Sequence, residues 1–245
     1  MTQSSVQFER GEAGLRALAA HAAVIVVVDV LSFSTAVDVA VSREALVRPA
    51  RFRGDDGLKL ATACDAILAV GRSRRSARTP YSLSPPTLAA LPKGARLVLP
   101  SPNGAALTML ASSETKARVI VGCLRNASAV ASFAQAHAEE GTVAVISAGE
   151  RWADGTLRPA LEDDLGAGAI IAGIHGGEAS PEARYVAEGF LRFRAELASE
   201  IEQTTSGREL IDAGYAEDVT FACALDESRT VPLVSADGFI RHAAP

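Results

Sequence analysis

Four short apolar runs, each followed by a polar loop and a segment rich in small residues, constrain the fold most strongly. The runs are residues 24–28 (VIVVV), 96–99 (RLVL), 118–121 (RVIV) and 142–146 (TVAVI). The segments after them predict helices at 36–41 and 105–111, at 127–139, and in the Gly/Ala-rich stretch that ends near residue 171. Continuous apolar strands that alternate with helices are typical of a largely parallel sheet covered on both faces. We therefore expect an α/β fold, layered α/β/α, on a largely parallel sheet.

The last third of the chain predicts more helix than strand. Residues 179–203 have helical periodicity, a further helix begins near 207–210, and residues 218–226 (DVTFACALD) have one apolar face. Residues 228–234 predict a short final strand.

The length and charge of the chain limit its class. Its 245 residues, 48% of them hydrophobic, suffice for a substantial core. We expect a single domain over residues 1–245, with two lobes as an alternative. The formal net charge of −5 argues against a nucleic-acid binder with a basic face, although it allows a local anion site.

The cysteines and histidines indicate no structural metal or disulfide framework. Cys64, Cys123 and Cys223 are widely spaced, without a C-x-x-C, and the four histidines lack metal-ligand spacing. The first long apolar run, 22–28, is too short to span a bilayer, and the N-terminal region lacks a signal-peptide pattern. We expect a soluble, cytoplasmic protein that binds no membrane. A homodimer is plausible only on the general frequency of dimers.

The segment 147–171 carries the strongest local signal for chemistry. It runs from the end of the fourth apolar run to a helix that begins with three consecutive acids, Glu162, Asp163 and Asp164. Adjacent carboxylates raise one another's pKa unless a cation or a helix N-terminus offsets their charge. The acids therefore indicate either a metal or polar-substrate site, or the ordinary preference of acids for a first helical turn.

Polar side chains follow every one of the four runs. In a parallel sheet the loops after the strands form the ligand crevice, so we expect these side chains to converge. They are Asp29, Ser32, Ser34, Thr35, Ser101, Asn103, Arg125, Asn126 and the loop 150–163. Ser34 and Thr35 could be simple N-caps, or part of an anion site at a helix N-terminus.

Three familiar phosphate-site signatures are absent from the sequence. Neither G-x-G-x-x-G nor a Walker A sequence occurs. The D-x-D pattern of another class of phosphatases is also absent, because the residue two places after Asp29 is not an acid.

Residues 71–86 (GRSRRSARTPYSLSPP) predict an extended loop. The loop is either a solvated surface segment or a lid whose arginines bind an anionic substrate, with Arg72 as the first candidate.

Together these segments resemble the 2-phosphosulfolactate phosphatase family. The resemblance begins at 29–35 (DVLSFST), 71–72 with 82–85, 101–104 (SPNG) and 122–131. It continues through 148–150, 162–168 and 218–226, so the matching segments occur in order over residues 24–234.

The resemblance implies an α/β fold with a mixed sheet and a Mg²⁺-dependent phosphatase of the coenzyme M pathway. Its substrate would be a small anionic phosphate ester, 2-phosphosulfolactate, cleaved to sulfolactate and phosphate. Two departures concern substrate recognition: Ser32 replaces an arginine, and Gly71 replaces a glutamate before Arg72. A serine cannot supply the charge that binds a sulfonate or phosphate, so another phosphorylated hydroxy acid is an alternative substrate.

The expected site follows from this resemblance and from the chemistry of the residues. Magnesium takes one or two carboxylates, waters and phosphate oxygens. The expected metal ligands are Asp29, Asp163 and Glu162, and the expected catalytic residues are Asp29, Arg72 and Asp163. The expected substrate-binding residues are Ser34, Thr35, Asn103, Gly104, Arg125 and Asn126.

Two other classes remain open from sequence. A nucleotide-binding oxidoreductase would have to bind its dinucleotide without the glycine fingerprint. A catalytically silent anion-binding or regulatory homologue is the second alternative, because of Ser32 and the shortened motif at Arg72.

Overall fold

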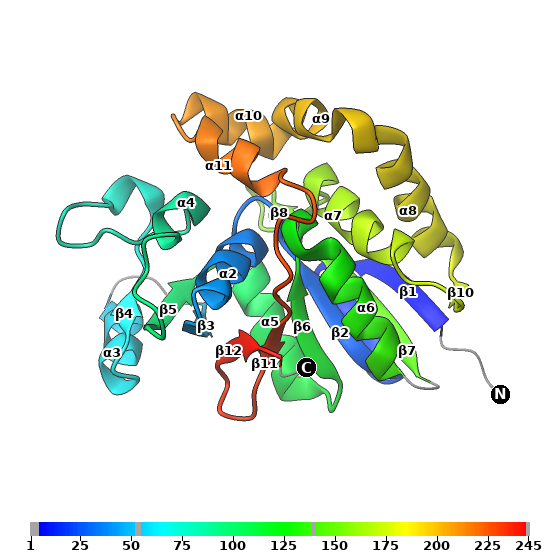
Figure 1. Ribbon diagram of the computed structural model, residues 1–245, viewed down its shortest axis with the longest axis horizontal. Helices are drawn as coiled ribbons and strands as arrows, with labels where there is room; N and C mark the ends of the chain where they lie inside the picture. The colour runs from blue at the N-terminus through cyan, green and yellow to red at the C-terminus, as the bar shows by residue number, and fades with distance from the viewer. Residues whose placement is uncertain (1–4, 52–54, 139–140, 244–245) are drawn as a thin grey trace.

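The predicted α/β fold is confirmed, with ten strands in one mixed, mostly parallel sheet flanked by helices (Figure 1). The computed structural model describes residues 5–51, 55–138 and 141–243. Along the sheet the strand order is β10-β1-β7-β2-β6-β11-β12-β3-β5-β4. The strands of this sheet are β1 (Ser5–Arg10), β2 (Ala22–Val28), β3 (Leu46–Ala50), β4 (Ile67–Leu68), β5 (Arg96–Pro100), β6 (Arg118–Gly122), β7 (Thr142–Ser147), β10 (Glu178–Ala179), β11 (Pro232–Val234) and β12 (Ile240–His242).

Two parallel blocks of the sheet are joined by the C-terminal hairpin. One block runs from β10 to β6 and the other comprises β3, β5 and β4. The hairpin β11–β12 lies between them and makes antiparallel pairs with β6 on one side and β3 on the other. The sequence predicts the first of these strands, at 228–234, but not the second, so it does not predict the junction.

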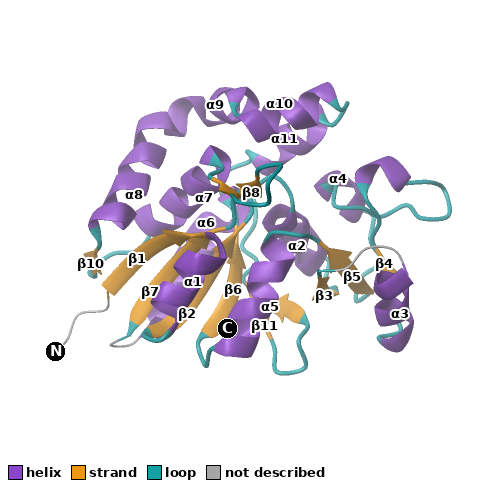
Figure 2. Ribbon diagram, turned by 180° about the vertical axis from the view of Figure 1, so that it is seen from behind, coloured by secondary structure: helices purple, strands orange, loops and turns teal. Residues whose placement is uncertain are grey.

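Helices cover both faces of the sheet, as expected for buried parallel strands. On the face in front in Figure 1 lie α2 (Phe33–Ser42), α6 (Ala127–Ala138) and α7 (Leu161–Ala172). On the opposite face, in front in Figure 2, lie α1 (Gly11–Ala19) and α5 (Gly104–Glu114). The predicted helices at 36–41, 105–111 and 127–138 are therefore confirmed; residue 139, the predicted end of the last, lies outside the described residues.

The C-terminal helices form an arch over one edge of the sheet in Figures 1 and 2. They are α8 (Pro181–Phe193), the short η3 (Arg194–Glu196), α9 (Leu197–Gln203), α10 (Thr205–Asp212) and α11 (Ala216–Ala222). Helix α8 packs closely on α7. The two helices approach so closely at Gly168 that a Cβ there would clash with the carbonyl oxygen of Val186.

Smaller elements complete the chain. They are α3 (Asp55–Ala63), η1 (Arg72–Arg74), α4 (Pro85–Leu88), η2 (Leu124–Asn126) and the two-stranded ribbon of β8 (Glu150–Arg151) and β9 (Leu157–Arg158). The predicted extended loop at 71–86 contains only η1 and the start of α4.

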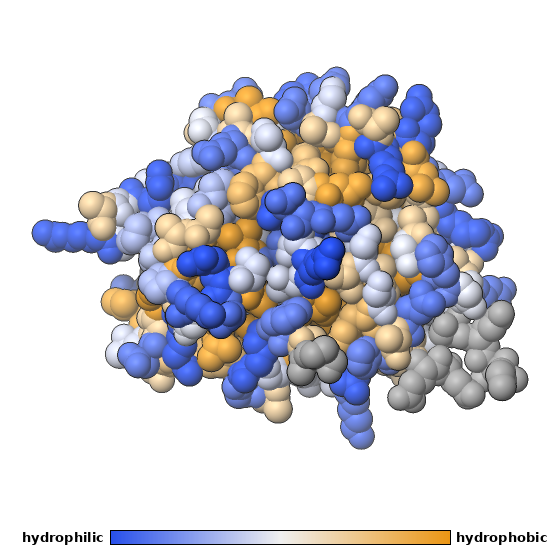
Figure 3. Space-filling model, in the orientation of Figure 1, coloured by the Kyte–Doolittle hydropathy of each residue, from blue (hydrophilic) through white to orange (hydrophobic). Residues whose placement is uncertain are grey.

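The surface in Figure 3 is mainly hydrophilic, with apolar areas near α8 and α9. Two large apolar side chains of α8 are well exposed, Tyr185 and Leu191. No helix among the described residues has the length and apolar character that crossing a bilayer requires. The homodimer stays a prediction.

Candidate active site

The carboxylate of Asp29 is held by the backbone of two loops. Asp29 follows β2, and its Oδ1 accepts hydrogen bonds from the backbone N–H groups of Ser32 (3.1 Å) and Phe33 (3.3 Å). Its Oδ2 accepts from the backbone N–H of Gly104 at 2.8 Å, at the start of α5. The acid is therefore fixed where the loops that follow β2 and β5 meet.

Asp163 lies in the first turn of α7 but does not act as a simple helix cap. Its Oδ1 accepts from the backbone N–H of Val30 at 2.7 Å, and its Oδ2 accepts from that of Gly149 at 2.9 Å. These groups belong to the loops after β2 and β7, so the carboxylate joins three segments. The adjacent Asp164 instead pairs with Arg10 (Nη2–Oδ2, 2.7 Å) and accepts from Ser147 Oγ.

Four acids form a carboxylate cluster, defined as Asp29, Glu150, Glu162 and Asp163. Burial raises the pKa of Asp29 despite its three backbone hydrogen bonds and the nearby charge of Arg72. Burial and the charges of Asp29 and Glu162 raise the pKa of Asp163 well above its usual value. Burial and the charge of Asp29 raise the pKa of Glu150 to about 7. The cluster therefore concentrates negative charge that a bound cation would offset.

The cluster fits a cation that completes its coordination with water and substrate. Glu162 is buried, and its carboxylate accepts no hydrogen bond from any described residue. Among the described residues, no three His, Cys, Asp or Glu side chains are arranged to hold a metal by themselves. Magnesium, which is commonly bound by only one or two carboxylates, suits this arrangement better than an ion that needs an all-protein cage.

Arg72 reaches the same region from η1. Its Nε donates to Asp218 Oδ2 at 2.6 Å, and its Nη2 donates to Ser32 Oγ at 2.9 Å. The guanidinium lies next to the loop that carries Asp29. The predicted role of this arginine is thus compatible with its position; in the 71–86 loop around it, residues 73–78 are exposed and residues 82–85 are buried.

A cavity of about 220 Å³ borders Asp29 and Glu150 of the carboxylate cluster and Arg72, whereas Glu162 and Asp163 are not among its lining residues. Asp29, Ser32, Arg72 and Asn103 line it together with Leu31, Leu83, Ser101, Pro102, Glu150, Ser206, Glu209 and Leu210. An acidic and a basic side thus face the same space, which is a suitable arrangement for a phosphate ester with a metal ion.

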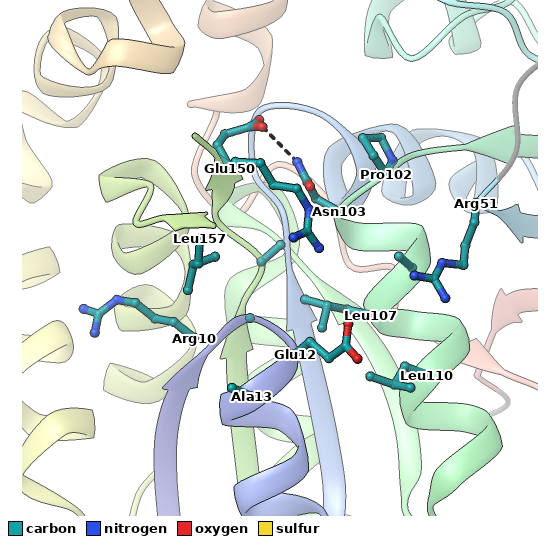
Figure 4. Close-up of a pocket in the computed structure, with 14 residues that line it drawn as sticks. Arg10, Glu12, Ala13, Arg51, Pro102, Asn103, Leu107, Leu110, Glu150 and Leu157 are labelled. Atoms are coloured by element: carbon teal, nitrogen blue, oxygen red, sulfur yellow. Dashed lines mark hydrogen bonds between the residues drawn. The ribbon is translucent and has the colours of Figure 1, made fainter. Parts of the chain in front are cut away.

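A second cavity lies on the other side of the hydrogen bond from Asn103 Nδ2 to Glu150 Oε2 (2.9 Å; Figure 4). Its volume is about 160 Å³, and Arg51 and Glu12 line it with apolar residues of α5. Arg10, although part of its wall, points away from the centre of the space in Figure 4. Asn103 and Glu150 belong to both cavities and separate them.

Several predicted substrate-binding residues have structural contacts instead. The hydroxyl of Ser34 accepts from the Asp29 backbone N–H at 2.9 Å, and that of Thr35 donates to the Val30 carbonyl at 2.8 Å; both side chains are fully buried. The Gly104 backbone N–H is already bound to Asp29. These residues shape the loops around Asp29 and do not present free donors to the cavity.

Arg125 and Asn126 lie away from the cavity, contrary to the expected convergence of all four loops. Arg125 donates to Asp38 Oδ2 at 3.2 Å and its guanidinium lies 4.2 Å from the centre of the Phe221 ring. Asn126 donates to the carbonyl of Thr230 at 3.1 Å. The segment that leads to β11 covers the loop after β6 and occupies its polar groups.

Two cavity residues, Glu150 and Ser206, and the Arg72 partner Asp218 carry weaker signals in the sequence. Glu150 lies in the predicted acidic loop, but its spacing does not single it out. Asp218 belongs to a motif shared with the family, without an evident role. Ser206 has no signal, because only the fold of the C-terminal helices places it over the cavity.

Comparisons with known proteins identify the family of this chain. Residues 15–237 match the family model described as 2-phosphosulpholactate phosphatase. A protein of Gloeobacter violaceus named "Probable 2-phosphosulfolactate phosphatase" is 31% identical over 122 residues. That match covers 50% of this chain and 49% of the relative, so the chain spans about half the length of the curated relative it matches. Because the family model covers most of the described fold, including both sides of the cavity, the chain belongs to the 2-phosphosulpholactate phosphatase family, whose members are hydrolases.

Proposed function

We propose that this protein is a Mg²⁺-dependent phosphatase that hydrolyses a small phosphorylated hydroxy acid, with 2-phosphosulfolactate as the first candidate substrate. The observation that carries the proposal is one cavity of a phosphatase-family chain that Asp29, Glu150 and Arg72 line together, with the buried Asp163 close enough to Asp29 for their charges to interact.

Asp29 and Asp163, with Glu162 as an additional or alternative ligand, are the residues proposed to hold the magnesium ion. Each oxygen of Asp163 accepts one backbone hydrogen bond, which leaves a second lone pair on each for a metal. When bound, the ion would neutralise charge on the phosphoryl oxygens.

Arg72 is the cation proposed to bind an anionic group of the substrate. Phosphoryl transfer depends mostly on positioning and charge neutralisation, so a metal site and an arginine beside the same cavity supply the main requirements. Asn103, which lines both cavities and donates to Glu150, would hold the wall between them.

Glu150 is proposed to protonate the leaving alcohol oxygen. A carboxyl group with a pKa of about 7 keeps its proton in a substantial fraction of molecules at neutral pH. Groups with a pKa close to the working pH serve best as general acids. Glu150 lines the cavity with Asp29 and Arg72, where the ester would be bound.

The test is phosphate release from 2-phosphosulfolactate, with Mg²⁺ and with EDTA, beside phospholactate and phosphoglycerate. Magnesium-dependent release that favours the sulfonate would support the proposal in full. Hydrolysis of another ester would support a phosphatase with a different substrate. No phosphate release from any of the three esters, with Mg²⁺ still bound, would favour the catalytically silent homologue.

A further inference from the structure

The C-terminal helices form one wall of the candidate active site. Ser206, Glu209 and Leu210 of α10 line the cavity, and Tyr215, just before α11, lies 5.8 Å from the Arg72 guanidinium, measured to its ring centre. Figure 1 shows α10 and α11 over the end of the sheet where α2 begins. Neither helix follows a strand of the parallel blocks, so the general rule for α/β sheets does not predict this wall.

Ser206 has a buried hydroxyl without a protein partner. Its exposed fraction is 6%, and its Oγ makes no hydrogen bond within the described part of the chain. The helix does not need this hydroxyl as a cap, because Thr204 Oγ1 already accepts from the Gly207 backbone N–H at 3.0 Å. A buried hydroxyl without a partner destabilises the folded protein, and such a group next to a cavity calls for a ligand.

Asp218 fixes the direction of the Arg72 guanidinium. The Asp218 carboxylate is buried; one oxygen accepts from Arg72 Nε at 2.6 Å and the other from Ser84 Oγ at 2.5 Å. With Nη2 also donating to Ser32, Arg72 is held on two sides. Its Nη1 has no hydrogen-bond partner among the described residues and remains available to an anion.

We propose that this wall is an anion-binding subsite, in which Ser206 Oγ and Arg72, positioned by Asp218, bind one acidic group of the ligand. The ligand group is a tetrahedral oxyanion, a sulfonate or a phosphate. Glu209 does not cancel the charge of the Arg72 guanidinium, because it pairs with Arg158 at 3.1 Å. Only the identification of the ligand as the substrate rests on the proposed function.

Ser206→Ala gives the first test, with inorganic phosphate and methanesulfonate as separate probes. Calorimetric titration of the full chain in EDTA measures anion binding without the metal. We expect about tenfold or greater weakening for the bound probe, because a hydrogen bond to a charged group is lost. The melting temperature without ligand should stay the same or rise, since the variant removes an unpaired hydroxyl. Ser199→Ala, on the exposed side of α9, is the matched control.

The outcomes of this test separate the two ligand sources. Ser206-dependent binding of methanesulfonate assigns the wall to a sulfonate, and Ser206-dependent binding of phosphate alone assigns it to a phosphoryl group. Unchanged affinity for both probes, or no binding of either by the wild type, overturns the subsite.

A double-mutant cycle tests the positioning role of Asp218. Asp218→Asn should weaken anion binding by about 10- to 100-fold, the usual effect of removing a group that orients a ligand-binding residue. The double variant with Arg72→Ala should bind no more weakly than Arg72→Ala alone, because Asp218 acts through that arginine. Additive losses would overturn the positioning role. Asp237→Asn, an exposed acid paired with Arg241, is the matched control.

These binding measurements distinguish the subsite from the proposed activity. If the wall binds an anion as described but no ester is hydrolysed, the subsite stands and the proposed function fails. If esters are hydrolysed while Ser206 and Asp218 have no effect on anion binding, the proposed function stands and the subsite fails.

Discussion

Asp29 Oδ2 accepts a hydrogen bond from the Gly104 backbone N–H at 2.8 Å, and this contact joins the two parallel blocks of the sheet at the candidate active site. Asp29 follows β2 of one block, whereas Gly104 follows β5 of the other. The contact requires a very close approach, since a Cβ at Gly104 would lie 2.6 Å from Asp29 Oδ2 and 2.5 Å from the Phe33 ring. The geometry of the acid thus depends on a residue without a side chain.

Gly104→Ala should therefore displace Asp29 and lower both stability and turnover. We expect about 1–3 kcal/mol of destabilisation from overpacking, with a clear loss of Mg²⁺ affinity. Urea unfolding and magnesium titration measure the two effects. Gly189→Ala is the control: its Cβ would meet no atom within 4 Å in α8, and the change should stabilise by about 0.5–1 kcal/mol. A Gly104→Ala protein with normal magnesium affinity would contradict the role of this contact.

Asp163→Asn should reduce kcat by about 10²–10³-fold. It should also lower the melting temperature, because the new amide group cannot accept from both the Val30 and the Gly149 N–H groups. Steady-state kinetics at saturating Mg²⁺ and thermal unfolding check the two parts. The adjacent Asp164→Asn serves as control, since Asp164 pairs with Arg10; its kcat should stay within about tenfold. Equal losses of kcat in both variants would contradict the proposal that Asp163, and not Asp164, is a metal ligand.

The sequence predicts β2, β6 and β7 of the first block and β5 of the second, because they are continuous apolar runs with helices after them. It does not predict β1, β3, β10 or β12. Consequently it does not predict that the C-terminal hairpin divides the sheet. Helix starts are also displaced: α2 begins at Phe33, before the apolar segment, because the Asp29 carboxylate binds the N–H groups of Ser32 and Phe33.

Asp29, Arg72 and Asn103 are site residues that the sequence predicts, and the structure places all three at one cavity. These residues directly follow strands or begin the arginine-rich loop, so their positions depend on local order. The positions of Ser206 and Asp218 at the site depend on how the C-terminal helices cross it. No local sequence pattern predicts that path. The strand-end rule predicts Arg125 at the site, but the chain before β11 covers its loop.

Arg125→Ala should affect stability rather than catalysis. The fully buried Asp38 would lose its ion-pair partner, and breaking such a pair costs about 3–5 kcal/mol. Urea unfolding should show this loss, while kcat/KM of the folded fraction stays near that of the wild type. A raised KM with an unchanged free energy of unfolding would instead support a role of Arg125 in substrate binding.

Glu150→Gln should slow hydrolysis in a way that depends on the leaving group. An alkyl phosphate needs protonation of its leaving oxygen, and loss of the general acid should cost about 10²-fold or more. An ester such as 4-nitrophenyl phosphate, whose leaving group is stable as an anion, should lose much less. Glu12→Gln is the control, because Glu12 lines the second cavity and pairs with Arg16. Equal losses on both esters would exclude proton donation by Glu150.

Without magnesium, the stability of the protein should decrease as the pH rises from about 4.5 to about 7. The folded-state pKa of Glu150 is raised from 4.5 to about 7, so within this interval the folded protein retains a proton that the unfolded chain has released. The unfolded state then binds fewer protons, and the free energy of unfolding falls with pH. The raised pKa values of Asp29 and Asp163 act in the same direction. Urea unfolding in EDTA at pH 5 and pH 8 measures the difference, and Glu150→Gln should reduce it. Magnesium should stabilise the protein more at pH 8 than at pH 5, because the ionised carboxylate cluster binds the cation. Stability that rises with pH in EDTA would show that the cluster is already neutralised within the protein.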